Sequence, residues 1–371
     1  MKFKCSQSML AKALNIVSKA VTSRTTIPIL KGILLEVSEN GTLKMSASDL
    51  DITIEETLNI EDAVPGSVVV QSKLFGDIIR KLPNADVTVS LEDGNVVIKR
   101  MNSQFSIIGL PADEFPNIKN IDGFKEDIHF NTTILKEMIR KTSFAASVDD
   151  SKGVITGILI ELLQDGVNMV AIDGYRMAIT RENMINIQEK NVIISAKIMN
   201  EISKILSEAN EEDETVKIML NDKRAIFVIG SIKVVLRLLD GEFIRYKDVL
   251  PKESKIKVRV NKSDLMESIE RASLLSKEGK NNLIKLSVRD TIVTITSKSE
   301  EGNVKEEVII NKTGDDLEIG FNAKYILDVL KSIDDEEIMM FFNTSITPCL
   351  VEPVEGNAFE YLILPVRITT N

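Results

Sequence analysis

The chain has 371 residues, a net charge of −10, 43% hydrophobic residues, two cysteines and one histidine. This length and hydrophobic content predict two or three globular domains. So few cysteines exclude a disulfide framework, and a single histidine argues against histidine metal sites and histidine-dependent triads. Two cysteines far apart in the sequence suit a reducing compartment, so we expect a cytoplasmic protein. We expect neither a signal peptide nor a membrane helix, because no long apolar run exists.

Alternating apolar and polar residues predict antiparallel strands with one wet face, and amphipathic stretches predict helices between them. The predicted strands of the first third are 1–5, 32–37, 42–47 and 52–55, followed by a hairpin of 87–91 and 96–99. Later strands include 256–260 and 292–296. The predicted helices are 8–22, 73–82, 132–147, 196–208, 263–278 and 323–333, with N-caps at Ser8, Ser72, Thr133, Ser195 and Ser263.

The helix signatures recur along the chain. Leu10, Leu135 and Leu265 occupy the same place in three similar segments that lie roughly 125 to 130 residues apart. Lys73, Lys197 and Lys324 repeat at a similar interval. A period of this length suits whole domains, so the sequence predicts an α+β fold of three tandem domains at 1–121, 122–250 and 251–371.

Charge is unevenly distributed. The six predicted helices together are net positive, although the whole chain is strongly negative. A nucleic-acid binder that relies on affinity is usually basic, so the overall sign argues against tight binding of that kind. The mildly basic helices are either a surface that meets a negatively charged partner or simply solvated helix faces that carry lysine. Both interpretations stay open.

No pattern in the sequence predicts catalysis. Phosphate-binding loops, dinucleotide fingerprints and nucleophile elbows are absent. Carboxylates cluster at 149–150, 211–214 and 334–337, in polar stretches typical of solvated loops. A two-metal nuclease that uses such carboxylates remains an alternative function.

Two peptides are more distinctive. Ala171–Ala178 predicts a tight turn between two strands, and Tyr361–Ile368 predicts a final strand in which Pro365 limits ladder pairing. An apolar terminal segment beside a Tyr-Arg turn is able to form a groove for a peptide. Ordinary core packing is the competing interpretation, and a peptide-binding scaffold without a DNA role is the competing function.

These segments, taken in order, resemble the bacterial DNA polymerase III beta subunit family, the sliding clamps. The resemblance covers the whole chain and is carried by the threefold repeat and by five segments: Arg24–Leu30, Leu110–Pro116, Asp173–Arg176, Gly320–Asn322 and Leu364–Arg367. It implies a head-to-tail homodimer that closes into a ring around double-stranded DNA, with sheets outside and helices lining the hole.

The resemblance also implies a function without catalysis or cofactors. A ring holds DNA by enclosure and therefore needs few phosphate contacts, which agrees with the acidic chain. The implied partners are the DNA polymerase III alpha subunit, the clamp loader, and other polymerases and repair proteins that dock through a short linear motif. No membrane partner is implied.

Three sets of residues match functional positions of the family. The DNA-facing set is Arg24, Lys73, Lys197, Asn322 and Tyr325. The peptide-binding set is Ile155, Ile172, Gly174, Tyr175, Arg176, Met177, Val249, Leu362, Leu364, Pro365, Val366 and Arg367. The dimer set is Phe105, Ile107, Leu274 and Leu275, for which burial in the chain's own core is the alternative.

The sequence departs from the usual family pattern beside the predicted peptide site. Ile244 and Arg245 replace a proline and an acidic or amide residue, and Asp248 replaces a frequent basic residue. Ala196 stands where a second basic residue is common, and Thr369–Asn371 extend past the usual end. These differences bear on peptide preference and DNA contact, whereas the expected fold is unaffected.

Overall fold

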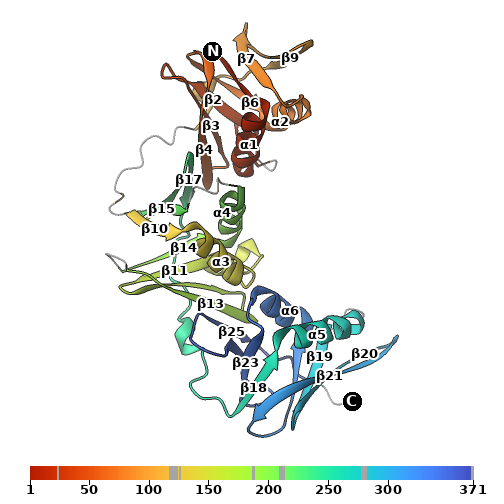
Figure 1. Ribbon diagram of the computed structural model, residues 1–371. Coiled ribbons are helices and arrows are strands. Elements are labelled where there is room, and N and C mark those ends of the chain that lie inside the picture. The colour runs from red at the N-terminus through yellow and green to blue at the C-terminus, as the bar shows by residue number, and fades with distance from the viewer. Residues whose placement is uncertain are drawn as a thin grey trace. The chain divides into compact units, whose positions relative to one another are not determined.

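The computed structural model describes residues 1–22, 25–116, 124, 127–185, 189–208, 214–276 and 282–368. It contains two compact units, residues 1–136 with 201–238 and residues 137–200 with 239–371 (Figure 1). Both are α+β, with helices packed on antiparallel sheets, as the sequence predicts. The predicted domain border at 121–122 and the extension Thr369–Asn371 lie outside the described residues.

Unit 1 holds a five-stranded sheet of order β5-β1-β7-β8-β9 and an eight-stranded sheet of order β10-β15-β16-β17-β4-β3-β2-β6. Its strands are β1 Lys2–Ser6, β2 Gly32–Val37, β3 Thr42–Ser48, β4 Ile52–Asn59, β5 Glu61–Val64, β6 Gly66–Gln71, β7 Asp86–Glu92, β8 Asn95–Arg100, β9 Ser103–Ile108, β10 Asp127–Asn131, β15 Thr215–Leu220, β16 Arg224–Ile229 and β17 Ile232–Arg237. Its helices α1 Gln7–Val17 and α2 Ser72–Lys81 contact each other, and α1 also contacts β3 and β4.

Unit 2 is built on a twelve-stranded sheet of order β14-β11-β12-β13-β25-β24-β23-β18-β21-β20-β19-β22. The strands are β11 Gly157–Leu163, β12 Gly166–Ile172, β13 Arg176–Asn183, β14 Lys190–Ser195, β18 Ile256–Asn261, β19 Leu283–Arg289, β20 Ile292–Ser299, β21 Gly302–Thr313, β22 Leu317–Asn322, β23 Glu337–Phe342, β24 Cys349–Pro353 and β25 Phe359–Ile363. Helices α5 Lys262–Ser276 and α6 Ala323–Ser332 pack together, and the division between the units falls within α3 Thr132–Ser143 and α4 Ala196–Glu208.

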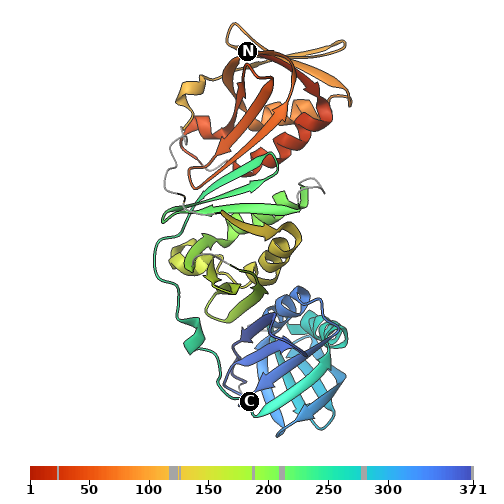
Figure 2. The ribbon, with the colours of Figure 1, turned by 60° about the vertical axis from the view of Figure 1, so that its left-hand side comes forward.

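Each unit joins strands from different sequence repeats. In unit 1, β17 pairs with β4, so that Val234 lies opposite Ile54. In unit 2, β13 pairs with β25, so that Met177 lies opposite Leu362. Backbone hydrogen bonds continue across both junctions, which leaves fewer open sheet edges. Figure 2 shows the connection from β17 to β18, which contains the short 3-10 turn Tyr246–Asp248.

Four of the five predicted helix N-caps differ from the observed ones, and Ser195 directly precedes α4. Ser6, rather than Ser8, accepts a hydrogen bond from the Met9 N–H at the start of α1. Asn131 caps α3 and Asn261 caps α5 through their side-chain oxygens, in place of Thr133 and Ser263. Ser72 is the first residue of α2 and is preceded by Gln71, which makes no side-chain cap. An asparagine side chain satisfies the free N–H groups of the first turn as well as serine does.

Candidate functional site

The turn between β12 and β13 is held by its own aspartate. Asp173 Oδ1 accepts hydrogen bonds from the backbone N–H groups of Tyr175 at 2.9 Å and Arg176 at 3.0 Å. Gly174 has φ of +93°, a conformation that side chains other than hydrogen resist. The turn therefore presents the Tyr175 ring, whose residue is 55% exposed, at a defined place on the surface.

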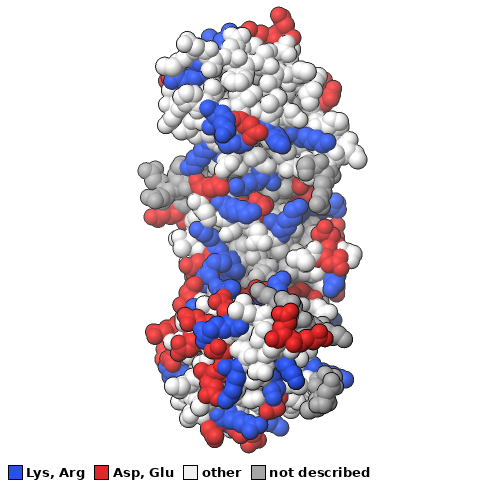
Figure 3. Space-filling view, turned by 90° about the vertical axis from the view of Figure 1, so that its right-hand side faces the viewer, with Lys and Arg blue, Asp and Glu red and all other residues white. Residues whose placement is uncertain are grey.

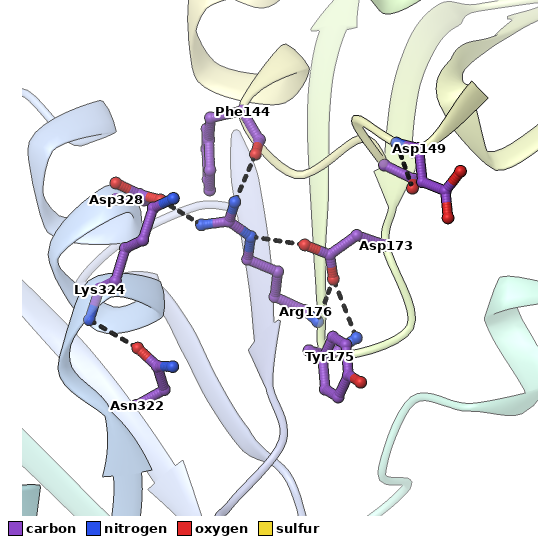
Figure 4. Close-up of polar contacts among 9 residues, drawn as sticks. Phe144, Asp149, Asp173, Tyr175, Arg176, Asn322, Lys324 and Asp328 are labelled. Carbon is purple, nitrogen blue, oxygen red and sulfur yellow. Dashed lines mark hydrogen bonds and ion pairs between the residues drawn. The ribbon is translucent and has the colours of Figure 1, made fainter. Parts of the chain in front are cut away.

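Arg176, which follows Tyr175, stabilises this turn from its buried side and is only 8% exposed. Its guanidinium donates from Nε to Asp173 at 3.0 Å, from Nη2 to the Phe144 carbonyl at 2.7 Å, and from Nη1 to Asp328 at 2.5 Å (Figure 4). Its Cζ also lies 5.3 Å from the Phe144 ring centre and 4.8 Å from that of Tyr325. Because these partners all belong to the protein, Arg176 supports the turn more than it offers donors to a ligand.

Tyr325 and Asn322, two residues of the predicted DNA-facing set, make contacts of other kinds. The Tyr325 ring stacks on that of Tyr175, with centres 5.7 Å apart and planes inclined by 20°. Burial and the charge of Asp173 raise the pKa of the Tyr325 hydroxyl. Asn322 caps α6, because its Oδ1 accepts from the Lys324 backbone N–H at 2.9 Å. The structure thus brings the start of α6 against the Tyr175 turn.

The C-terminal segment joins the same turn. Beyond the end of β25, the Leu364 N–H donates to the Tyr175 carbonyl at 2.9 Å, and the Val366 N–H donates to the Gly320 carbonyl at 2.8 Å. Pro365, which has no N–H, lies between these two bonded positions. A Cβ on Gly320 would stand 2.7 Å from the Val366 carbonyl oxygen, so only glycine permits this approach of the tail to β22.

An apolar cluster connects the turn with the tail. It includes five of the residues predicted for peptide binding: Ile155, Ile172, Met177, Leu362 and Leu364. Val249 and Arg367 are exposed, at the end of the Tyr246–Asp248 turn and in the tail respectively. Further members of the cluster could not be predicted from the sequence, because nothing in their local pattern distinguishes them from other core residues; they include Phe243, Tyr246, Leu250, Phe341 and Leu350.

A buried carboxylate lies beside this cluster. Glu161 accepts hydrogen bonds from the Tyr246 hydroxyl at 2.5 Å and from Asn168 at 3.0 Å, and Lys247 is 3.4 Å away. Burial alone would raise the pKa of Glu161, but the hydrogen bonds and the lysine charge outweigh it and hold the pKa below its usual range. Burial and Glu161 together raise the pKa of Tyr246. This network ties the Tyr246–Asp248 turn to β11.

Lys73 and Lys197, for which the family resemblance implies a position facing DNA, lie exposed in the first turns of α2 and α4. Neither makes an ion pair with another residue that the structure describes. Figure 3 shows Lys and Arg side chains over one face of each unit, among patches of Asp and Glu. Arg24, the first predicted DNA-facing residue, lies outside the described residues.

The predicted dimer residues lie at two places in the fold. Phe105 is exposed on β9, the last strand of its sheet, whereas Ile107 is buried within unit 1. The neighbouring Ile108, which the sequence analysis missed, is 76% exposed. Leu274 on α5 is 65% exposed and Leu275 is partly buried. Residues 302–309 of β21 pair with β20 on one side, whereas on the other side β21 pairs with β18 through residues 310–313.

Other features of the structure lie away from these residues. A cavity of about 530 Å³ in unit 1 is formed by the eight-stranded sheet and residues of the segment Ala112–Pro116, and none of the predicted site residues that the structure describes lines it. Within the described part of the chain, no group of three or more His, Cys, Asp or Glu side chains is arranged to hold a metal ion. No described helix has the length and apolar character needed to cross a membrane.

Comparison with known proteins places the chain in one family. Three family models, for the N-terminal, central and C-terminal domains of the DNA polymerase III beta subunit, match residues 1–119, 129–244 and 247–367. The beta sliding clamp of Staphylococcus aureus is 35% identical over 380 residues, 99% of each chain.

Solved structures of DNA polymerase III beta subunits have the same fold as this chain. The DNA polymerase sliding clamp of Bacillus subtilis superposes with a TM-score of 0.94 and 34% identity over all of both chains. A putative DNA polymerase III beta subunit from Eubacterium rectale has a TM-score of 0.93 and 36% identity over 99% of each chain. The chain belongs to the DNA polymerase III beta subunit family, and is a sliding clamp, a processivity factor without catalysis of its own.

Proposed function

We propose that two copies of this chain close head to tail into a ring around duplex DNA and tether DNA polymerase III to it. The observation that carries the proposal is the full-length match to proteins named sliding clamps. The proposed domains are residues 1–121, 122–250 and 251–371, so that a ring holds six. The exposed strand β9, with Phe105 and Ile108, would pair with residues 302–309 of the other copy, near Leu274.

The charge of the chain suits enclosure. Each phosphate that a protein neutralises adds salt-dependent affinity, which opposes sliding. Lys73 and Lys197 therefore need only centre the duplex, over a Debye length of about 8 Å at physiological ionic strength. The net charge of −10 repels DNA from the rest of the surface. We place the protein in the cytoplasm, where replication occurs, and assign it no cofactor.

The ring is tested with a nicked circular plasmid. After loading by the clamp loader, we expect the protein to elute with the circle through a gel-filtration column at 0.2 M salt, because a closed ring cannot leave a circle. Cutting the plasmid once should release the protein, because the ring can slide off the ends of linear DNA. Protein that binds by adhesion would be retained equally on linear and circular DNA, and that result would contradict the proposal.

We assign the peptide-binding site to the Tyr175 turn, the apolar cluster and the C-terminal tail. The exposed Tyr175 ring and the partly buried Ile155 and Leu364 offer apolar surface, and a peptide with apolar end residues would gain most of its affinity there. The proposed partners are the polymerase alpha subunit, the clamp loader, and other polymerases and repair proteins that carry such a motif.

Deletion of residues 364–371 is expected to abolish binding of a fluorescent peptide that carries the alpha-subunit motif, a loss of at least about 100-fold in affinity. The deletion removes Leu364 from the cluster and the bond from its N–H to Tyr175. Fluorescence anisotropy measures the affinity, and a thermal melt checks that the variant is folded. A variant without residues 369–371 alone is the matched control. Unchanged binding by the longer deletion would remove the tail from the site.

A further inference from the structure

We propose that Asp328 is a positioning residue for peptide binding: through Arg176 it holds the Tyr175 turn in its binding geometry without touching the peptide. The inference rests on the proposed peptide site. It concerns a carboxylate from α6 in the third repeat, whereas the turn comes from the second repeat. No sequence pattern points to Asp328 or to its connection with the turn.

Asp328 is one of three protein groups that accept a hydrogen bond from the guanidinium of Arg176. The other two, Asp173 and the Phe144 carbonyl, belong to the same repeat as Arg176. Asp328 is therefore the only one of the three that ties the arginine to α6, and the close-up in Figure 4 shows it approaching from the side opposite Asp173. Arg176 is nearly buried, and an interaction between such a group and a carboxylate is little screened by solvent.

A second contact on the same face of α6 reinforces this connection. Tyr325 precedes Asp328 by three residues, and residues at that spacing lie side by side on a helix. The Tyr325 ring stacks on Tyr175 and also lies 4.8 Å from the Arg176 Cζ. Helix α6 thus holds the turn at two adjacent points, by charge at Arg176 and by ring stacking at Tyr175.

Loss of the Asp328 carboxylate would release one end of this arrangement. Arg176 would keep its hydrogen bonds to Asp173 and Phe144 but would lose its charged partner on α6. The ring of Tyr325 would then remain as a contact between α6 and the turn, and it does not fix the turn as firmly. The Tyr175 carbonyl also accepts a hydrogen bond from the Leu364 N–H, so a shift of the turn would displace the C-terminal tail as well. Helix α6 itself should persist, because its buried residues Ile326, Val329 and Leu330 face the core.

The test measures the affinity of the full-length protein for the fluorescent alpha-subunit peptide. We expect Asp328→Asn to weaken binding by about 10-fold, the effect of one charge-assisted hydrogen bond on the turn. Asp328→Glu, which keeps the carboxylate, should restore affinity to within about 3-fold of the wild type. Asp328→Ser replaces the Asn variant if thermal melting shows that the latter is unfolded.

Asp334→Asn is the matched control. Asp334 follows the end of α6 and pairs with Arg140 at 2.5 Å and Lys141 at 3.0 Å on α3, so it also joins the second repeat to the third. It does not contact the turn, and its loss should leave peptide affinity within about 2-fold.

The outcomes separate the two proposals. If the wild type does not bind the peptide, the proposed peptide site fails. If the wild type binds and Asp328→Asn binds equally well, the site stands and the positioning role is wrong. Equal weakening by Asp328→Asn and Asp334→Asn would also overturn the role, because it would reflect a general loosening between the repeats. If Asp328→Glu binds the peptide as weakly as Asp328→Asn does, the positioning role is also wrong.

Discussion

Replacing Leu274 by aspartate is expected to raise the dissociation constant of the dimer by at least about 100-fold. The residue is 65% exposed on α5, and in the proposed ring it packs against the other copy. The change removes about 2 kcal/mol of apolar burial and adds a carboxylate that must lose water. A head-to-tail dimer has two identical interfaces, so the ring suffers the loss twice. Sedimentation velocity measures the dissociation.

The same variant should not be retained on nicked circular DNA. Ile346→Asp is the control, because Ile346 is also an exposed residue of unit 2 and lies outside the proposed interface. It should leave both dimerisation and retention unchanged. A Leu274→Asp protein that sediments as a dimer at micromolar concentration would exclude this residue from the interface and would favour another arrangement of the two copies.

Replacing Glu56 by glutamine is expected to stabilise unit 1 at alkaline pH. Glu56 is 5% exposed on β4, and its Oε2 makes no hydrogen bond with any residue that the structure describes. Burial, partly offset by the charge of Lys12, raises the pKa of this carboxyl to about 7. The folded protein therefore keeps its proton at a pH where the unfolded chain has already lost it.

The pH dependence follows from this difference. Between the unfolded pKa of 4.5 and the folded pKa of about 7, the native state binds more protons, so the free energy of unfolding falls as pH rises. Above about pH 8 the wild type carries the full cost of an ionised, buried Glu56. Glutamine cannot ionise, so Glu56→Gln should be more stable by about 2 kcal/mol at pH 8.5 and nearly unchanged at pH 5.

Urea unfolding at the two pH values measures this effect. Glu55→Gln is a suitable control, because Glu55 directly precedes Glu56 on β4 and is partly exposed on the opposite face of the sheet. It should show no comparable gain at alkaline pH. Equal stability of the wild type and Glu56→Gln at pH 8.5 would mean that Glu56 ionises in the folded protein at little cost.

The sequence predicted the six helices well, because an amphipathic period is local and its apolar face must be buried. Helix 196–208 agrees with α4, and 73–82 and 323–333 lie within one residue of α2 and α6. The predicted helices 8–22 and 132–147 were too long, because α1 ends at Val17 and α3 at Ser143, and the predicted end of 263–278 lies outside the described residues. The predictions of the helix N-caps were less accurate. Asn131, Asn261 and Asn322 act as caps, whereas serine or threonine was expected at or near most of these starts. Several polar residues compete at each helix start, and only the backbone conformation decides which one accepts the hydrogen bond.

The threefold repeat, the α+β class and the tight turn before Tyr175 could be predicted from the sequence, because each is visible as a pattern of residue types along the chain. The contacts that hold the turn could not be predicted, because they join residues that are distant in the sequence. Arg176 meets Asp328, 152 residues away, and Tyr325 stacks on Tyr175. Tyr325 was predicted only to face DNA, since its position in the sequence does not reveal its packing. Such contacts arise only when the sheet joins β13 to β25 and thereby sets α6 beside the turn.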